Sequence, residues 1–91
     1  MAFRDVAPQA PVHVLVVPRR HIDHAGALGD EDAGDLSALF AAARAVAATE
    51  GIAGDDRGYR LVMNVGADAQ NSVPHLHLHL IGGRSMTWPP G

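Results

Sequence analysis

The segment Pro74-His75-Leu76-His77-Leu78-His79-Leu80-Ile81 alternates histidine with leucine and holds three of the chain's six histidines. Side chains alternate between the two faces of a β-strand, so a strand over His75–Ile81 places the three imidazoles on one face and the leucines on the other. Neighbouring histidines on that face are then roughly 6.5–7 Å apart. The leucines predict contact with a hydrophobic core. The histidines predict a chemical role, because imidazole is a donor, an acceptor, a nucleophile and a metal ligand near neutral pH.

Two further strands and one helix are predicted from the rest of the chain. Val12–Val17 is a short apolar, β-branched run, and Tyr59–Val65 is a second segment bounded by turn residues, so both are predicted as strands. Apolar residues recur at steps of three and four from Asp32 to about Glu50, which predicts an amphipathic helix that Gly51 ends. We therefore expect an α+β domain with a mostly antiparallel sheet and one long helix.

Length and composition restrict the chain to one small domain, residues 1–91, and exclude several classes of protein. The 91 residues are 47% hydrophobic and carry a formal net charge of −3, with scattered arginines and no lysine, which disfavours binding to a nucleic-acid polymer. The absence of cysteine excludes disulfides, cysteine-based zinc sites and a thiol nucleophile. No secretory signal is recognisable, and the run Val14–Val17 is too short to cross a membrane, so a cytoplasmic location is predicted.

Three interpretations of the histidine segment remain open on residue chemistry alone. The segment is an exposed polar face, or two or three of its histidines bind zinc, with Asp68 as the nearest carboxylate in sequence. The third interpretation is nucleophilic catalysis on phosphorus by a central histidine. Asn64, Ser72 and the backbone amides of the loop Gly66–Ser72 are then close enough in sequence to bind phosphate oxygens.

The pattern His-φ-His-φ-His-φ-φ, where φ is apolar, fits His75–Ile81, and the whole chain resembles the Hint branch of the histidine triad (HIT) superfamily. The terminal Trp88–Gly91 is similar to the segment that separates this branch from the dinucleoside-polyphosphate hydrolases. The resemblance also covers Ala2–Asp5, Pro8–His13, Pro18–Ile22, Gly58–Arg60, Asn64, Ser72–Val73 and Gly82–Arg84. It implies a HIT-like fold whose sheet extends across a homodimer.

The resemblance implies a purine nucleoside phosphoramidase that cleaves the P–N bond of adenosine 5′-phosphoramidate-like substrates and releases AMP, without a metal or another cofactor. His77 would attack phosphorus to form a nucleotidyl-histidine, His79 would bind phosphate oxygens, and His75 with His13 would form a supporting proton and orientation network. Asp5 would bind the ribose hydroxyls. The remaining nucleotide contacts are implied for Phe3, Val6, Asn64, Gln70, Asn71, Ser72 and Trp88, the last reaching the partner subunit's site.

Two departures from the family pattern affect these expectations. The sequence starts inside the family's second strand, either because this start is genuine or because a mis-called initiation codon removed the front; a genuine start predicts an incomplete sheet and a weaker pocket for the nucleobase. Ala69-Gln70-Asn71 stands where relatives have a glycine-rich stretch, and the side chain of Gln70 is expected to narrow the approach of phosphate to the backbone.

Alternatives from other classes of function remain: a non-catalytic nucleotide-binding or interaction module, and a histidine-based zinc-binding protein. Single residues also have purely structural interpretations. His13 is equally typical of a hydrogen-bonded core histidine, Asp5 of an Asx-turn, and Trp88 of a core side chain. His21 and His24 are predicted to be surface or local capping residues, and Arg19-Arg20 a solvated pair.

Overall fold

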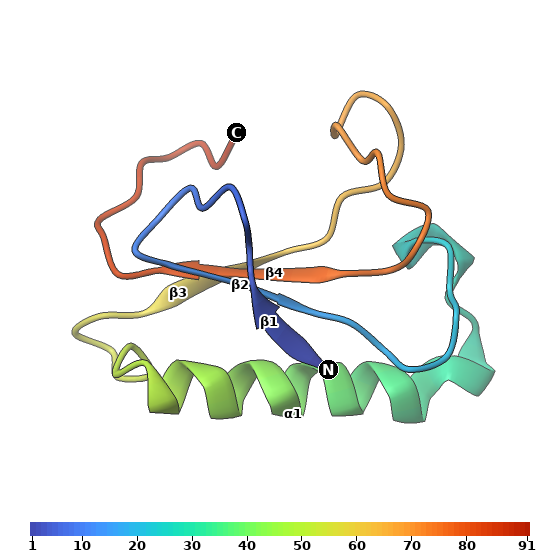
Figure 1. Cartoon of the computed structure of the whole chain (residues 1–91), viewed down its shortest axis with the longest axis horizontal. Coiled ribbons are helices and arrows are strands. Elements are labelled where there is room, and N and C mark those ends of the chain that lie inside the picture. Colours follow the sequence, from blue (N-terminus) through green and yellow to red (C-terminus); the bar gives the residue numbers. More distant parts are fainter.

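The computed structural model describes all 91 residues, Met1–Gly91, and consists of a four-stranded sheet with one long helix packed on one face (Figure 1). All strand pairs are antiparallel, and the spatial order is β1-β2-β4-β3. The strands are β1 (Ala2–Arg4), β2 (Val12–Val16), β3 (Tyr59–Val62) and β4 (Leu78–Gly82). The helix is α1 (Ala33–Thr49), preceded by the short 3₁₀ turns η1 (Ala25–Ala27) and η2 (Asp30–Asp32). The α+β prediction is confirmed.

The strand that carries the histidines is shorter than the alternation predicts. β4 begins at Leu78, not at His75, because Leu76 donates its backbone N–H to the carbonyl of Ile22 at 2.6 Å instead of joining β2. The alternation of environment nevertheless continues through the whole segment. Its three leucines are buried, and its three histidines are half-buried. The second predicted strand also ends early, at Val62.

α1 begins and ends where its flanking residues predict. The carboxylate of Asp32, only 4% exposed, accepts the N–H of Gly29 at 2.9 Å and contacts the guanidinium of Arg20, which fixes the turn before the helix. Gly51 adopts a φ of 75°, the left-handed conformation that commonly follows a helix. No helix in the structure has the length and apolar character needed to span a bilayer.

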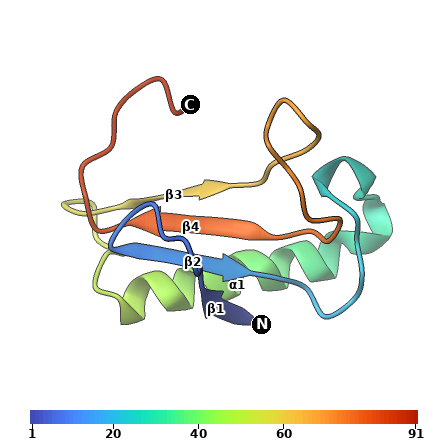
Figure 2. The ribbon, with the colours of Figure 1, turned by 45° about the horizontal axis from the view of Figure 1, so that its top comes forward.

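The hydrophobic core lies between α1 and one face of the sheet (Figure 2). Alternate residues of β2 and β4 point into it, among them Val14, Val16 and Leu80. Ala43 and Ala47 on α1 are completely buried, and their small side chains allow the helix to lie close to the strands.

The opposite face of the sheet carries the histidines. His13 and His79 alternate with the core residues of β2 and β4, so their side chains point away from α1. Residues 5–11, 63–77 and 83–91 form loops and a C-terminal tail on this side of the sheet (Figures 1 and 2). The fold therefore separates a helix face, which supplies stability, from a histidine face surrounded by loops.

Candidate active site

The register of β2 against β4 brings His13 and His79 together on the histidine face. Leu15 lies opposite His79 and His13 lies opposite Ile81, so the two histidines are diagonal neighbours. Nε2 of His13 is 2.9 Å from Nδ1 of His79, and their ring centroids are 5.1 Å apart. Two imidazoles 66 positions apart in the sequence thus form one hydrogen-bonded pair.

The hydrogen bonds assign the protons on this pair. The backbone N–H of Gln9 donates to Nδ1 of His13 at 3.1 Å, so this nitrogen carries no proton. In the neutral ring the proton is then on Nε2, which donates to Nδ1 of His79. His79 keeps its own proton on Nε2, and that N–H is available to an oxygen of a bound ligand.

His77 has the opposite arrangement. Its Nδ1 lies 2.8 Å from the carbonyl oxygen of His75, and because a carbonyl can only accept, Nδ1 carries the proton. Nε2 of His77 is therefore an unprotonated nitrogen with a lone pair. The ring centroid of His77 is 5.0 Å from that of His79. A nucleophilic nitrogen and a hydrogen-bond donor therefore lie side by side.

The pKa of His79 is lowered from its ordinary value of 6.5. Burial is the largest cause, because it disfavours the charged ring, and the neighbouring His77 and then His13 lower the pKa further. Asp5 acts in the opposite direction with a smaller effect. His79 is thus held in the neutral form that the hydrogen-bond assignment requires.

His75 contacts His21 and not His13. Its Nδ1 lies 3.1 Å from Nδ1 of His21, because His75 precedes β4 and lies beside the loop that contains Ile22 instead of beside β2. His75 and His13 therefore belong to separate hydrogen-bonded contacts, and their supporting roles in a proton and orientation network stay a prediction. His21 is exposed, as expected of a surface residue. It also contacts His75, a member of the histidine triad His75, His77 and His79, and the sequence interpretation missed this contact.

Asp5 lies directly after β1 and faces His13. Its Oδ1 accepts the N–H of Ala7 at 2.8 Å, which confirms the Asx-turn, and its Oδ2 is 3.4 Å from Nε2 of His13. Phe3 lies opposite Leu15, and hence on the histidine face, with 46% of its surface exposed. Val6 is fully exposed.

Asp5, His13 and His79 are the residues whose arrangement comes closest to that of a metal site, with ligand atoms within 4.8 Å of one another. The zinc interpretation had named two or three histidines of the segment His75–His79, with Asp68 as the nearest carboxylate; of these only His79 belongs to this set, and Asp5 and His13 are remote from it in sequence. The set does not fit a metal ion in this structure. Nδ1 of His13 accepts the Gln9 N–H, so coordination through Nε2 would require the ring either to lose its last proton or to move that proton to Nδ1 and give up this hydrogen bond.

The loop after β3 holds the other polar residues predicted to contact phosphate. Gln70 has a φ of 59°, a conformation that few residues other than glycine adopt, and the N–H of Asn71 donates to the carbonyl of Gly66 at 3.1 Å. Oδ1 of Asn71 is buried without a hydrogen-bond partner in the protein. Asn71 and the exposed Ser72 line an open hollow of about 500 Å³ that also includes Asp23. Asn64 is half-buried just beyond the end of β3.

Trp88 is 81% exposed, so its interpretation as a core side chain is wrong. The guanidinium carbon of Arg60 lies 5.8 Å from the centroid of its ring, and Arg60 also donates to the carbonyl of Thr87 at 2.5 Å. These contacts hold the irregular C-terminal tail against β3, an edge strand of the sheet.

The structural interpretation of His24 is confirmed, whereas that of Arg19-Arg20 as a solvated pair holds for Arg19 only. His24 accepts the N–H of Gly26 at 3.1 Å and caps η1, as predicted. Arg19 is exposed, and Arg20 contacts Asp32 and Asp35, the latter at 3.1 Å, so this pair serves the surface and the start of α1. Neither arginine contacts the triad.

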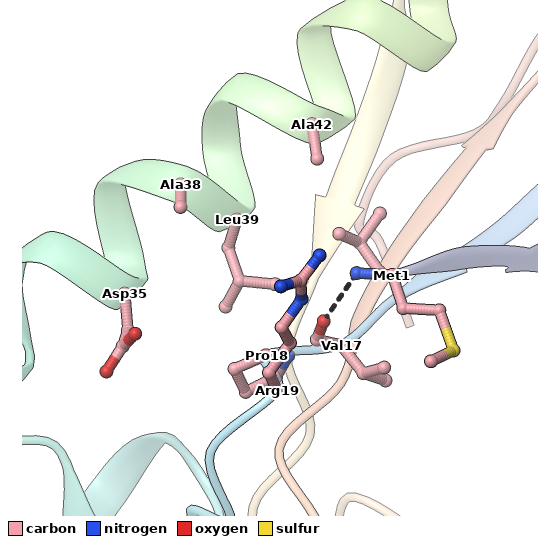
Figure 3. Close-up of a pocket in the computed structure, with 9 residues that line it drawn as sticks. Met1, Val17, Pro18, Arg19, Asp35, Ala38, Leu39 and Ala42 are labelled. Carbon is pink, nitrogen blue, oxygen red and sulfur yellow. Dashed lines mark hydrogen bonds between the residues drawn. The ribbon is translucent and has the colours of Figure 1, made fainter.

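A second cavity, of about 200 Å³, lies on the helix side of the sheet (Figure 3). It is lined mainly by apolar side chains between α1 and the start of β1, and the amino group of Met1 donates to the carbonyl of Val17 beside it at 3.0 Å. None of the predicted site residues lines this cavity. The histidine face is therefore the candidate active site.

Comparison with known proteins agrees with this geometry. The sequence profile of the HIT domain matches residues 1–86. The chain belongs to the HIT family. An uncharacterized HIT-like protein of Synechococcus elongatus is 48% identical over 91 residues, which cover 100% of this chain and 77% of that protein. A second uncharacterized HIT-like protein, from Synechocystis, is 50% identical over 91 residues, which cover 100% of this chain and 77% of that protein.

Solved structures of HIT proteins share the fold. A HIT family hydrolase from Legionella pneumophila superposes with a TM-score of 0.93 at 47% identity, over 99% of this chain and 79% of that one. A histidine triad nucleotide-binding protein from Candida albicans gives a TM-score of 0.65 at 27% identity, over 99% of this chain and 68% of that one. These similarities establish the HIT fold of the chain.

Proposed function

We propose that this HIT protein is a purine nucleotide-binding hydrolase that cleaves the P–N bond of nucleoside 5′-phosphoramidates through a nucleotidyl-histidine. His77 is the nucleophile and His79 binds the phosphate. The proposal is supported by family membership and by two structural neighbours, a HIT family hydrolase and a histidine triad nucleotide-binding protein.

One observation carries the proposal: the hydrogen bond from Nδ1 of His77 to the carbonyl of His75. It fixes the tautomer in which Nε2 of His77 has a free lone pair, so this residue needs neither a metal nor a separate base to become a nucleophile. A positive charge that develops on the imidazole during attack is stabilised by the same carbonyl oxygen at 2.8 Å.

The reaction requires two displacements at phosphorus. In the first, the lone pair of His77 Nε2 forms the N–P bond, the P–N bond of the substrate breaks, and the amine, protonated from solvent, leaves with the electron pair of the broken bond. In the second, water attacks phosphorus and gives up a proton to solvent, the His77–phosphorus bond breaks with its electron pair returning to Nε2, and the nucleoside monophosphate is released. The Nε2–H of His79 donates to a phosphate oxygen in both steps, where charge redistributes as bonds change.

The nucleotide is expected to lie across the histidine face, with its ribose at Asp5 and its base beside Phe3 and Val6. Phe3 and Val6 are both exposed on the surface of the chain, so the base pocket is open on this side. We further propose that the protein is a homodimer and that Trp88 contributes to the site of the partner subunit.

The test is AMP release from adenosine 5′-phosphoramidate in the presence of a chelator. We expect turnover by the wild-type chain and none by His77→Asn, whose side-chain amide can still donate to the carbonyl of His75 but has no atom at the position of Nε2. Nucleotide binding by the variant, measured calorimetrically with AMP, should persist.

Two other outcomes would contradict this function. AMP binding without turnover by the wild type would favour the non-catalytic nucleotide-binding module. Turnover that is lost when the chelator is added would favour a metal-dependent reaction. It would also show that the hydrogen bond at Nδ1 of His13 does not prevent metal binding.

A further inference from the structure

His21 forms the centre of a hydrogen-bonded row that ends at the triad. Nε2 of His21 is 2.7 Å from Oδ1 of Asp23, and Nδ1 of His21 is 3.1 Å from Nδ1 of His75. The rings of His21 and His75 are tilted by 33°, with centroids 5.1 Å apart. His21 is exposed and lies far from His75 in sequence, so it has no local structural reason to meet the triad.

The backbone holds the two histidines opposite each other. Ile22, which follows His21, is 6% exposed in the core, and its carbonyl accepts the N–H of Leu76, the residue after His75. Before His21, the side chain of Arg20 is tied to Asp35 at the start of α1. Both neighbours of His21 are therefore fixed, and the contact with His75 follows from a constrained backbone, not from a chance meeting of two mobile side chains.

The row assigns the protons on both rings. A carboxylate can only accept, so Nε2 of His21 carries a proton and, in the neutral ring, Nδ1 is an acceptor. Nδ1 of His75 must then carry the proton that lies between the two rings, which leaves Nε2 of His75 unprotonated. This is the tautomer that an isolated histidine disfavours in water.

We propose that His21, oriented by Asp23, is a positioning residue that fixes the ring and tautomer of His75. The effect reaches the nucleophile because the carbonyl of the same residue, His75, accepts from Nδ1 of His77. His21 therefore acts through His75 and does not itself touch the substrate. For its effect on turnover, the proposal rests on the function proposed above.

Two substitutions of His21 by amides, compared with His21→Ala, separate the loss of the hydrogen bond to His75 from the loss of side-chain volume. The amide of asparagine overlays the Nδ1 position of histidine, so His21→Asn keeps an acceptor for His75. The longer amide of glutamine overlays the Nε2 position, so His21→Gln keeps only the contact with Asp23. We expect kcat for phosphoramidate cleavage to fall about 10-fold in His21→Ala and His21→Gln, with KM little changed, and to stay within about 3-fold of wild type in His21→Asn.

Arg44→Ala is the control, because it removes an exposed basic side chain from α1, on the opposite side of the sheet from the histidine face. Its kcat should equal that of the wild type. Equal kcat for the glutamine and asparagine variants, or a wild-type kcat in His21→Ala, would overturn the role in turnover.

A second measurement does not depend on turnover. Long-range ¹H–¹⁵N spectra of the histidine rings distinguish the two neutral tautomers, and at pH 8 we expect His75 to be protonated at Nδ1 in the wild type and at Nε2 in His21→Ala. A wild-type His75 protonated at Nε2 would overturn the positioning role itself. If instead the wild-type chain shows the expected tautomer but no turnover, the positioning role stands and the proposed function fails.

Discussion

The imidazole of His79 is enclosed between His13, whose Nε2 is 2.9 Å from its Nδ1, and His77, whose ring centroid is 5.0 Å away. Burial and these two neighbours lower its pKa, in that order of causes. A neutral His79 donates a hydrogen bond from its Nε2–H to phosphate. Because the ring is uncharged, it does not repel the positive charge that forms on His77 during attack. The lowered pKa is therefore useful to the proposed chemistry, and it also makes the fold sensitive to acid.

The stability of the protein should fall as the pH falls below the ordinary histidine pKa of 6.5. The unfolded chain binds a proton at His79 before the folded chain does, so the stability that His79 contributes is complete above 6.5 and is lost as the pH falls towards its lower folded pKa. Replacement by glutamine removes this titration. We expect the free energy of unfolding, measured with urea between about pH 8 and pH 5, to fall more steeply in wild type than in His79→Gln.

Equal slopes for the two proteins in that series would show that the folded pKa of His79 is not lowered. The comparison of the two slopes, not the wild-type slope alone, isolates His79 from the five other histidines.

At the scale of elements, β4 is the strand on which both faces depend. Leu78 and Leu80 are among the most completely buried side chains, and His79 lies between them on the other face. The strand ends at Gly82, which is packed against the segment after α1. A methyl group built there would lie 2.7 Å from Cδ1 of Ile52 and 3.3 Å from the carbonyl oxygen of Gly58.

Gly82→Ala should therefore destabilise the fold by about 1–3 kcal/mol, the usual cost of inserting a methyl group into a filled space. Gly34→Ala is the matched control, because Gly34 lies in α1 with no atom within 4 Å of the added carbon. It should stabilise the protein by about 0.4–1 kcal/mol by restricting the unfolded chain. Urea unfolding of both variants measures the two effects, and a neutral Gly82→Ala would show that the side chain of Ile52 moves aside without cost.

The helix and three of the four strands could be predicted from local patterns, because each pattern acts over a few residues; no pattern of its own predicted β1. The steps of three and four from Leu36 to Ala47 predicted α1, and alternation predicted the buried leucines before and within β4. Strand ends were less predictable. The N–H of Leu76 bonds to Ile22, a partner remote in sequence, and no local signal marks Leu78 as the start of the strand.

The site could be predicted only in part, for the same physical reason. Three histidines in one segment indicated chemistry, but their partners depend on register between distant segments. The pair His13–His79 follows from the alignment of β2 with β4, and the row Asp23–His21–His75 follows from the backbone bond of Leu76. Family resemblance supplied the role proposed for His13, and neither resemblance nor pattern indicated His21.

At the scale of the whole molecule, the two faces of the sheet have different roles: one packs against α1 in the core, and the other carries the histidines. The helix face holds nearly all of the buried apolar side chains, and the histidine face is bordered by three irregular segments (Figure 2). One of them, the C-terminal tail, carries Trp88, which is 81% exposed and lies beside Arg60 of the edge strand β3. A tryptophan this exposed is typical of a residue that contacts another molecule.

If the protein is a homodimer in which Trp88 serves the partner's site, two inactive variants should complement each other. A subunit with His77→Ala still supplies Trp88, and a subunit with Trp88→Ala still supplies His77, so a mixed dimer contains one complete site. After unfolding and refolding together in equal amounts, the mixture should reach about a quarter of wild-type activity, because half of the dimers are mixed and each has one working site.

The control is a mixture of His77→Ala with His79→Ala. Both side chains belong to one subunit's site, so the mixed dimers of this pair contain no complete site. Activity of the first mixture equal to the mean of its two components would show that Trp88 acts within its own chain, or not at all.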